Sequence, residues 1–468
     1  MKYKGMSVEE FLNSEVDLEE LYSELREELQ RIEKDLELVR PGDEGSGDLK
    51  GEGKLKGLPV SLKDCICAKG MKSYAGSKIL EGYRPPFDST VAEKLKEDGA
   101  NIIGKTHQDE FGFGTFSTNC TYAQPKNPWD GERSCGGSSG GAGGLTAALD
   151  FPHISIGEST GGSISNPASF CGVVGLTPTY GIVSRYGLIS YGNSLDKIGP
   201  LGRTVEETAI GLETISGKDP RDQTSVESNG GYREALDKSV KGMNIGIPEE
   251  YLEGIDGEIK KKVMDAVTEL ENLGAERKDI SLPMTEAALH AYYVVAMAES
   301  STNLAKYCGL RYGLHEKLEG NFDGYFSKVR GSGFGDEAKR RVMLGTYTRM
   351  AGYREKYYLK ALKVRRKVIQ DFKRAFKDVD VLAAPAMPMV APRFGEIEDL
   401  SPVEIYNLDK LTVPANFAGI PQISIPCGFK DGMPVGLHLL GDHFQEKKII
   451  NVASSYERGR GKIKYPEV

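Results

Sequence analysis

The sequence has no long apolar run and no N-terminal segment of the kind that directs a protein to a membrane. No stretch reaches the roughly 18 consecutive apolar residues that a spanning helix needs. The first residues, MKYKGMSVEEFL, lack the apolar core of a signal peptide. We therefore expect a cytoplasmic protein that makes no contact with a membrane.

Cysteine and histidine are also sparse, and their spacing argues against two further classes of protein. The seven cysteines are odd in number and include no CxxC pair, which argues against a disulfide framework. The six histidines form no HExxH motif and no paired Cys/His spacing, so we expect no metal site. Acidic residues exceed basic ones by 68 to 60, and the net charge is −8. Because nucleic-acid binders are usually basic, any RNA contact should be local or made by a partner.

The overall composition is typical of a large globular protein. The chain has 468 residues, of which 39% are hydrophobic and 27% charged, enough for two or three modules around sizeable cores. Its 57 glycines are well above the usual share of about 7%. They are clustered, which indicates loops where the backbone approaches another group closely.

The hydrophobic pattern alternates between strands and helices. An acidic amphipathic helix is predicted at residues 7–40, begun by a capping box of Ser7 and Glu10, and an exposed Gly/acid-rich loop at 41–53. Short apolar runs predict strands at residues 58–66, 100–106, 153–157, 379–388 and 421–426. Further helices are predicted at residues 91–99, 145–149, 257–275 and most of 285–375. This alternation predicts an α/β sheet whose functional loops follow the strand ends.

Changes in composition divide the chain into four parts. They are an N-terminal helical segment with its acidic loop (1–54), a core (55–250), a mostly helical part (251–375) and a C-terminal part (376–468). The polar third part lies between two parts that contain strands. We therefore expect it to be a helical cap or insertion, after which the chain returns to the core sheet.

One motif matches a phosphate-binding loop by letters alone. Residues 99–106, GANIIGKT, fit the pattern GxxxxGK[ST]. A phosphate loop needs a strand before it, a flexible turn within it and a helix after it. Here a predicted helix comes before and the middle is strand-like, so nucleotide binding is not expected. Gly99 is better explained as the residue that ends the preceding helix.

Two glycine-rich segments contain serines that are candidates for catalysis. The first, CGGSSGG, covers residues 135–141 and would otherwise be a flexible linker. The second, GESTGGSISNP, covers residues 157–167 and follows a predicted strand. Several backbone N–H groups converging on one point are what an oxyanion hole requires, and Ser163 would then be the nucleophile. The alternative is a tight turn in which Ser163 only caps a helix.

A lysine near the end of a predicted strand is the candidate base. Lys63 lies in GLPVSLKD, residues 57–64. An isolated lysine at such a place usually reaches solvent, whereas a buried one loses its charge and becomes a base. Neither serine-containing loop has a histidine, so a serine nucleophile there needs another base, and lysine is the available type.

Taken together, GLPVSLKD, CGGSSGG and GESTGGSISNPASFCGVVGLTPTYG resemble the amidase signature family in order and spacing. The resemblance covers about residues 55–455. It is strongest to the subgroup of A subunits of aspartyl/glutamyl-tRNA amidotransferases, through residues 100–114, 180–200, 298–313, 340–347 and 411–428. It implies a central mixed β-sheet flanked by helices. It also implies an enzyme whose nucleophile is Ser163, with Ser138 as the bridging serine after a cis peptide and Lys63 as the general base.

Further site residues follow from the same resemblance. The oxyanion would be held by the backbone amides of Thr160, Gly161, Gly162 and Ser163. Arg341 and Asp409 match positions that bind the amino-acid end of glutamine, with Arg340 as an adjacent alternative. Without the resemblance, Arg341 would be a solvated helix residue and Asp409 a helix cap. The chain departs from the family pattern at Ser159, where aspartate is usual, and at Cys65, where asparagine is usual.

The function implied by the resemblance is that of a glutaminase subunit in protein biosynthesis. Glutamine would be hydrolysed, and its ammonia would pass to a partner that amidates misacylated Glu-tRNA(Gln) or Asp-tRNA(Asn). The implied partners are the B and C subunits of a heterotrimer, with tRNA held mainly by the B subunit. No cofactor is expected in this chain, since ATP and Mg would be bound by the partner. The alternatives are a free-standing amidase and a non-catalytic scaffold that retains the fold.

Overall fold

The computed structural model describes residues 2–41, 49 and 51–466. Most of the loop expected at residues 41–53 lies outside the described residues. In the described part of the chain, no helix has the length and apolar character needed to cross a membrane.

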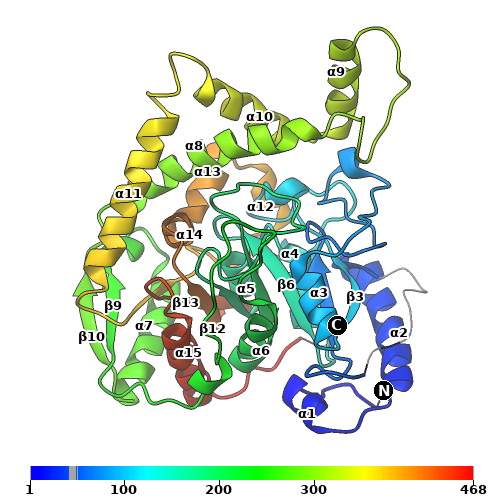
Figure 1. Cartoon of the computed structure of the whole chain (residues 1–468). Coiled ribbons are helices and arrows are strands. Elements are labelled where there is room, and N and C mark those ends of the chain that lie inside the picture. Colours follow the sequence, from blue (N-terminus) through cyan, green and yellow to red (C-terminus); the bar gives the residue numbers. More distant parts are fainter. Residues whose placement is uncertain (1, 42–48, 50, 467–468) are drawn as a thin grey trace.

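A single large sheet forms the centre of the protein, with helices on both of its faces (Figure 1). Within the described residues it has eleven strands, in the order β1 (Val39–Pro41), β3 (Asn101–Thr106), β2 (Pro59–Lys63), β6 (Ile154–Ser159), β8 (Lys197–Gly202), β7 (Val174–Thr177), β12 (Gln422–Lys430), β13 (Met433–Leu440), β11 (Val381–Pro385), β9 (Asn244–Pro248) and β10 (Glu276–Ile280). Parallel pairs (β2 with β3 and β6, β9 with β10 and β11) occur beside antiparallel ones. The expected α/β fold with a central mixed sheet flanked by helices is therefore confirmed.

The register of two central strands positions the candidate site. β2 and β6 run parallel, with Val60 opposite Ile154 and Leu62 opposite Ile156. Both strands are buried along their whole length, as their apolar sequences predict. Because the carboxyl ends of parallel strands meet at one edge of a sheet, Lys63 at the end of β2 lies beside the end of β6.

Helices cover the sheet and carry its loops. They include α3 (Thr90–Glu97), α4 (Gly140–Ala148), α5 (Ser165–Cys171), α6 (Val205–Ile215), α7 (Gly257–Asn272) and α15 (Glu446–Arg460). α5 packs on β12 and β13, and α4 packs on β6. Both α4 and α5 are buried throughout, because small residues allow them to lie close to the strands.

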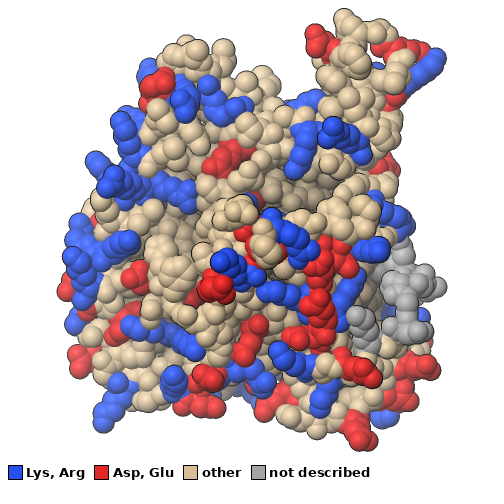
Figure 2. All heavy atoms as spheres, in the orientation of Figure 1, with Lys and Arg blue, Asp and Glu red and all other residues tan. Residues whose placement is uncertain are grey.

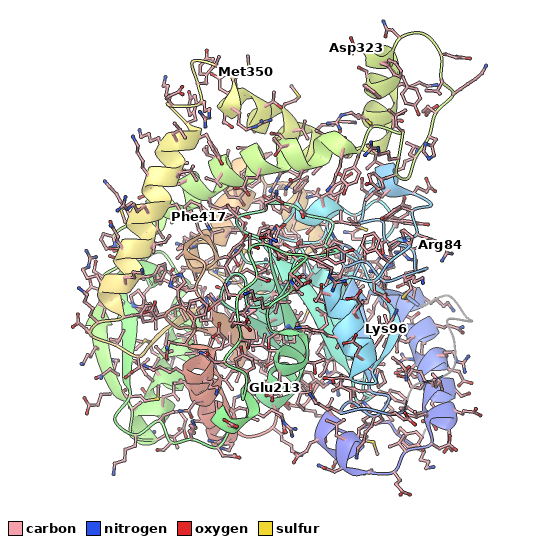
Figure 3. All side chains as sticks on the ribbon, in the orientation of Figure 1. Arg84, Lys96, Glu213, Asp323, Met350 and Phe417 are labelled. Atoms are coloured by element: carbon pink, nitrogen blue, oxygen red, sulfur yellow. The ribbon has the colours of Figure 1, made fainter. Side chains whose placement is uncertain are left out.

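Four further helices form a cap on one end of the sheet (Figure 1). They are α8 (Thr285–Asn303), α9 (Phe322–Gly333), α10 (Asp336–Arg349) and α11 (Tyr358–Ala375). Figure 3 shows Met350 at the corner between α10 and α11, and Asp323 at the far end of α9. Phe417, on α14 (Val413–Ala418), lies beneath the cap and packs edge-on against Tyr292 of α8. Residues 257–280, which were expected in the helical part of the chain, are not in this cap. They form the helix α7 and the edge strand β10 of the sheet.

Charge is distributed unevenly over this surface. Figure 2 shows Lys and Arg side chains gathered at the edge where α11 lies, while acidic and basic residues are mixed over the lower part. The basic residues of α11 include Lys360, Lys363, Arg366 and Lys367. The surface therefore has a local strip of basic residues along α11, although the net charge of the chain is −8.

One prediction of local structure was wrong, and one hairpin was missed. The single helix expected at residues 7–40 is two helices, α1 (Val8–Asn13) and α2 (Leu18–Leu36). The capping box of Ser7 and Glu10 is present, but Asp17 starts a new helix by accepting hydrogen bonds from the first backbone N–H groups of α2. The strand β13 was not expected. It forms a hairpin with β12 through an Asp431–Gly432 turn, in which both residues have positive φ.

The apparent phosphate loop lies on a strand. Gly99 has φ +85° just after α3, as expected for a residue that ends a helix, and residues 101–106 are β3. Lys105 is buried, and its ammonium donates to the carbonyl oxygen of Ile66. The strand is paired with β1 and β2 and is followed by a loop and a short 3₁₀ helix (Glu110–Gly112) instead of an α-helix, so the segment lacks the geometry of an anion-binding cradle.

Candidate active site

Lys63 lies at the carboxyl end of β2 and does not reach solvent. Its side chain is fully buried. The Nζ atom lies 2.7 Å from Ser138 Oγ, 2.8 Å from the carbonyl oxygen of Glu158 and 3.0 Å from Glu158 Oε2. A lysine in hydrogen-bond contact with a buried serine has the geometry of a general base.

The glycine-rich loop before α4 presents Ser138 to this lysine. The peptide bond between Gly137 and Ser138 is cis. A Cβ atom at Gly137 would lie 2.3 Å from Asp109 Oδ2, so this position requires glycine. The next residue, Ser139, donates from its hydroxyl to the carbonyl oxygen of Glu158 at 3.0 Å. The loop is thus tied to the end of β6, and the segment is not a flexible linker.

Ser163 follows β6 in the turn that leads into α5. It is 6% exposed. Its carbonyl oxygen accepts a hydrogen bond of 3.2 Å from the Ser139 backbone amide, which joins the two serine-containing loops. A Cβ atom at Gly162 would lie 2.3 Å from Thr412 Oγ1, so the turn passes too close to its neighbour for any other residue.

The backbone amides of this turn are available to a ligand. Among the described residues, the N–H groups of Gly161, Gly162 and Ser163 donate to no other protein group. Buried amides are almost always paired with protein or water. Free donors beside a serine hydroxyl are what an oxyanion hole provides.

A small pocket connects Ser163 with residues of the cap. It encloses about 10 Å³ and is lined by Gly112, Gly114, Thr115, Gly137, Thr160, Gly162, Ser163, Tyr191, Tyr292, Tyr293, Arg341 and Asp409. Seven separate stretches of the chain, between residues 112 and 409, therefore contribute to one space.

Arg341, on α10, lies in this pocket and is 3% exposed. Its Nε donates to Glu337 Oε1 at 2.7 Å, and its Nη1 donates to the hydroxyl of Tyr191. The neighbouring Arg340 bonds the other oxygen of Glu337, but its side chain is 40% exposed and does not line the pocket. The structure thus brings Arg341 rather than Arg340 to the site.

Asp409 faces the pocket from the other side. Its Oδ2 accepts hydrogen bonds from the hydroxyls of Tyr293, at 2.7 Å, and Thr115, at 3.2 Å. Burial raises the pKa of Asp409 to about 6. An arginine and a carboxylate in one small pocket suit a ligand that has both charges at one end.

Three groups that shape this site were not predicted from the sequence. Glu158 contacts Lys63 through its carbonyl and its carboxylate, although it lies within a motif singled out for its glycines and serine. The carboxylate of Asp109 accepts hydrogen bonds from the backbone amides of Ser117 and Asn119, and its own backbone amide donates to the carbonyl oxygen of Ser138 at 3.3 Å. Tyr293, which orients Asp409, is a helix aromatic without a distinguishing sequence signal.

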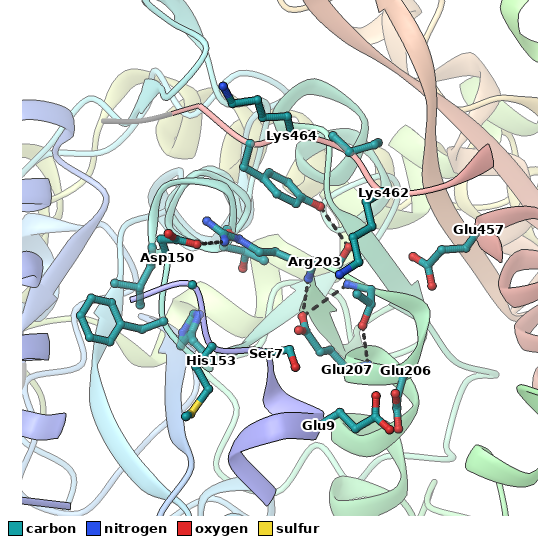
Figure 4. Close-up of a pocket in the computed structure, with 18 of the residues that line it drawn as sticks. Ser7, Glu9, Asp150, His153, Arg203, Glu206, Glu207, Glu457, Lys462 and Lys464 are labelled. Carbon is teal, nitrogen blue, oxygen red and sulfur yellow. Dashed lines mark hydrogen bonds and ion pairs between the residues drawn. The ribbon is translucent and has the colours of Figure 1, made fainter. Parts of the chain in front are cut away.

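A much larger cavity, of about 900 Å³, lies at the end of the molecule that carries α1 (Figure 4). Its walls come from the N-terminal segment, α6 and the C-terminal tail. Charges of both signs meet there, for example in the pair of Arg203 Nη1 and Asp150 Oδ1 at 2.6 Å. None of the predicted site residues lines this cavity.

Comparison with known proteins agrees with this site. A sequence model of the family described as Amidase matches residues 41–450. The A subunit of glutamyl-tRNA(Gln) amidotransferase from Methanococcoides burtonii is 51% identical over 413 residues, which are 87% of this chain and 86% of the relative. The protein of that name from Halothermothrix orenii is 46% identical and spans 98% of this chain and 96% of the relative. The crystal structure of the A subunit of glutamyl-tRNA(Gln) amidotransferase from Thermotoga maritima superposes with a TM-score of 0.86 at 36% identity, covering 100% of this chain and 98% of that one. This chain therefore belongs to the amidase family.

Proposed function

We propose that this protein is the glutaminase subunit of a cytoplasmic tRNA-dependent amidotransferase. It hydrolyses glutamine and supplies ammonia for the conversion of a misacylated tRNA to its amidated form. One observation carries the proposal: the loop that bears the buried contact of Lys63 with Ser138 is bonded to Ser163, which lines a pocket that also contains Arg341 and Asp409. The names of the relatives agree with it.

In the proposed reaction, Ser163 Oγ attacks the side-chain amide carbon of glutamine. Ser138 takes the proton of Ser163 and passes its own to neutral Lys63, whose Nζ lies 2.7 Å away. The free amides of Gly161, Gly162 and Ser163, with that of Thr160, hold the developing oxyanion. The proton returns to the leaving nitrogen, ammonia departs, and water hydrolyses the glutamyl ester.

The amino-acid end of glutamine is bound away from the reacting amide. Its carboxylate pairs with Arg341 and its ammonium with Asp409, which Tyr293 and Thr115 orient. Binding the charged end remotely places the amide over Ser163 and lowers the entropic part of the barrier. An uncharged amide would leave unused the N–H groups of Arg341 that do not bond Glu337 or Tyr191. This disfavours a free-standing amidase that acts on simple amides.

The second half of the reaction requires partners. We propose the B and C subunits of the amidotransferase as those partners, with ATP, Mg and the misacylated tRNA bound mainly by the B subunit. The substrate of the complex is Glu-tRNA(Gln), Asp-tRNA(Asn) or both. No residue of this chain is assigned to the ATP-dependent step. The matching relatives are themselves named as subunits, which supports an assembly of this kind.

Replacing Ser163 by alanine in the assembled complex tests the division of labour. Glutamine hydrolysis should be lost, while amidation from added ammonium should remain nearly intact, because the partner performs that chemistry. The matched control is Ser165→Ala. This serine is buried nearby, and its hydroxyl bonds His438, but it does not line the pocket. Equal loss of both activities in a folded Ser163→Ala complex would contradict the proposal. Hydrolysis without any amidation by the wild-type complex would favour the free-standing amidase.

A further inference from the structure

A second ionisable side chain lies against the lysine base. Glu158 is at the end of β6, its side chain is 4% exposed, and its Oε2 lies 3.0 Å from Lys63 Nζ. A Cβ atom at Gly112 would lie 3.4 Å from Ser138 Oγ and 3.5 Å from Glu158 Oε2, so the carboxylate and the serine face the same small space. Glu158 Oε1 has no hydrogen-bond partner within the described chain.

Two further carboxyl groups and one thiol lie near Lys63 and Glu158. Burial, followed by the charge of Glu158, raises the pKa of Asp196 well above its usual value. Burial raises the pKa of Asp109 to about 6. Burial also raises the pKa of the Cys65 thiol, which therefore stays neutral.

The charges on the neighbouring strand and loops have other partners. Asp64 pairs with Arg40, with Oδ1 2.5 Å from the guanidinium, and accepts backbone amides of residues 74 and 76. Lys105 of β3 donates to a carbonyl oxygen. Arg341 is engaged in the substrate pocket, where it lies beside Glu337. Among the described residues, Glu158 is thus the carboxylate that contacts Lys63 directly.

The number of hydrogen bonds at Nζ gives this contact a directional role. A neutral lysine amine has two N–H groups and one lone pair. Its two N–H groups match the two acceptors of Glu158, the carbonyl oxygen at 2.8 Å and Oε2 at 3.0 Å. The third direction, that of the lone pair, then points to Ser138 Oγ at 2.7 Å. A base aimed in this way needs no reorganisation before proton transfer.

We infer that Glu158 is a positioning residue that aims the lone pair of Lys63 at Ser138. The inference rests on the base role of Lys63 in the proposed function. The carboxylate oxygen 3.0 Å from Nζ holds one N–H group of the amine. If that oxygen is drawn back, the lone pair is free to turn away from Ser138, so the position of the oxygen, rather than its charge, is what the base requires.

The test compares kcat and KM of Glu158→Gln and Glu158→Asp with those of the wild type. Glutamine at position 158 keeps an oxygen acceptor within reach of Nζ, whereas aspartate keeps the charge but draws the oxygen back by one methylene group. Glu158→Gln should therefore keep kcat within about threefold, while Glu158→Asp should lower kcat about tenfold at an unchanged KM. A short aliphatic primary amide without an amino-acid head should serve as the substrate, because binding by Arg341 and Asp409 then does not enter the comparison. Glu28→Asp is the matched control. Glu28 is also 4% exposed and ion-paired, to Arg31 on α2, and its change should leave kcat in place.

Two outcomes would overturn the inference. One is a fall of kcat in Glu158→Gln as large as that in Glu158→Asp, and the other is a wild-type kcat in Glu158→Asp. Thermal unfolding of each variant reports whether it is folded. Substantial activity of Lys63→Ala would instead overturn the proposed base, so the two failures are distinguishable.

Discussion

Arg341→Ala should impair the hydrolysis of glutamine far more than that of an amide without an amino-acid head. The guanidinium has five N–H groups. Within the described chain, Nε and one N–H of Nη1 are used by Glu337 and Tyr191. Three N–H groups remain for a carboxylate that enters the pocket. A pair of these can bind a carboxylate in the bidentate manner.

The size of the effect follows from one charge-assisted hydrogen bond. Such a bond contributes about 1.5–3 kcal/mol, so kcat/KM for glutamine should fall about tenfold to a hundredfold. A headless amide or ester never uses the contact, and its kcat/KM should change little. The ratio of the two losses therefore separates substrate recognition from a general disturbance of the pocket, which would affect both substrates alike.

Arg340→Ala is the matched control for this measurement. Both arginines bond Glu337, but the Arg340 side chain is 40% exposed and lies outside the pocket. Its removal should leave kcat/KM for glutamine within about twofold, since exposed ion pairs contribute little. An equal fall for glutamine and the headless substrate in Arg341→Ala would show that Arg341 is structural. A selective loss in Arg340→Ala would show that the other arginine of the pair binds glutamine.

Three further expectations concern the base, the turn and the pH dependence. Lys63→Arg should lower kcat as much as Lys63→Ala does, by about a hundredfold or more, because arginine stays charged; an active Lys63→Arg enzyme would refute the neutral base. Gly162→Ala should lower kcat for both substrates at least about tenfold, since its Cβ would lie 2.3 Å from Thr412 Oγ1. Gly131→Ala, with no atom within 4 Å of the added Cβ, should not, and equal effects would contradict the steric argument. Because burial raises the pKa of Asp409 to about 6, protonation below that pH removes its charge. Glutamine kcat/KM should then fall relative to the headless substrate, and the same excess fall in Asp409→Asn would refute this assignment.

Much of the fold was predictable because its signals are local. β2, β3, β6, β11 and β12 lie where short apolar runs predict strands. The capping box of Ser7 and Glu10 also formed as its spacing predicts. The break between α1 and α2 was missed because the hydrophobic spacing continues across it, while Asp17 starts a second helix. The β12–β13 hairpin was missed although its Asp-Gly turn is a local signal.

The pairing of distant segments required the tertiary structure. Lys63 and Ser138 are 75 residues apart, and the parallel register of β2 with β6 brings the lysine to the loop. The same register places Glu158 against the base, a contact that its glycine-rich motif does not indicate. Sequence spacing within a strand does not specify which strand lies beside it.

By itself, the sequence determined the family and the chemical types at the site: two serines in glycine-rich turns, a lysine at a strand end and no histidine nearby. These features are local, because a turn that brings its amides together needs glycine wherever it lies in the fold. Only the tertiary structure decided between Arg340 and Arg341. Adjacent residues on a helix point about 100° apart, so the packing of α10 against α8 and the core determines which guanidinium enters the pocket. It likewise decided that Lys63 is buried rather than solvated, since burial depends on what covers a strand end and not on the strand's own residues.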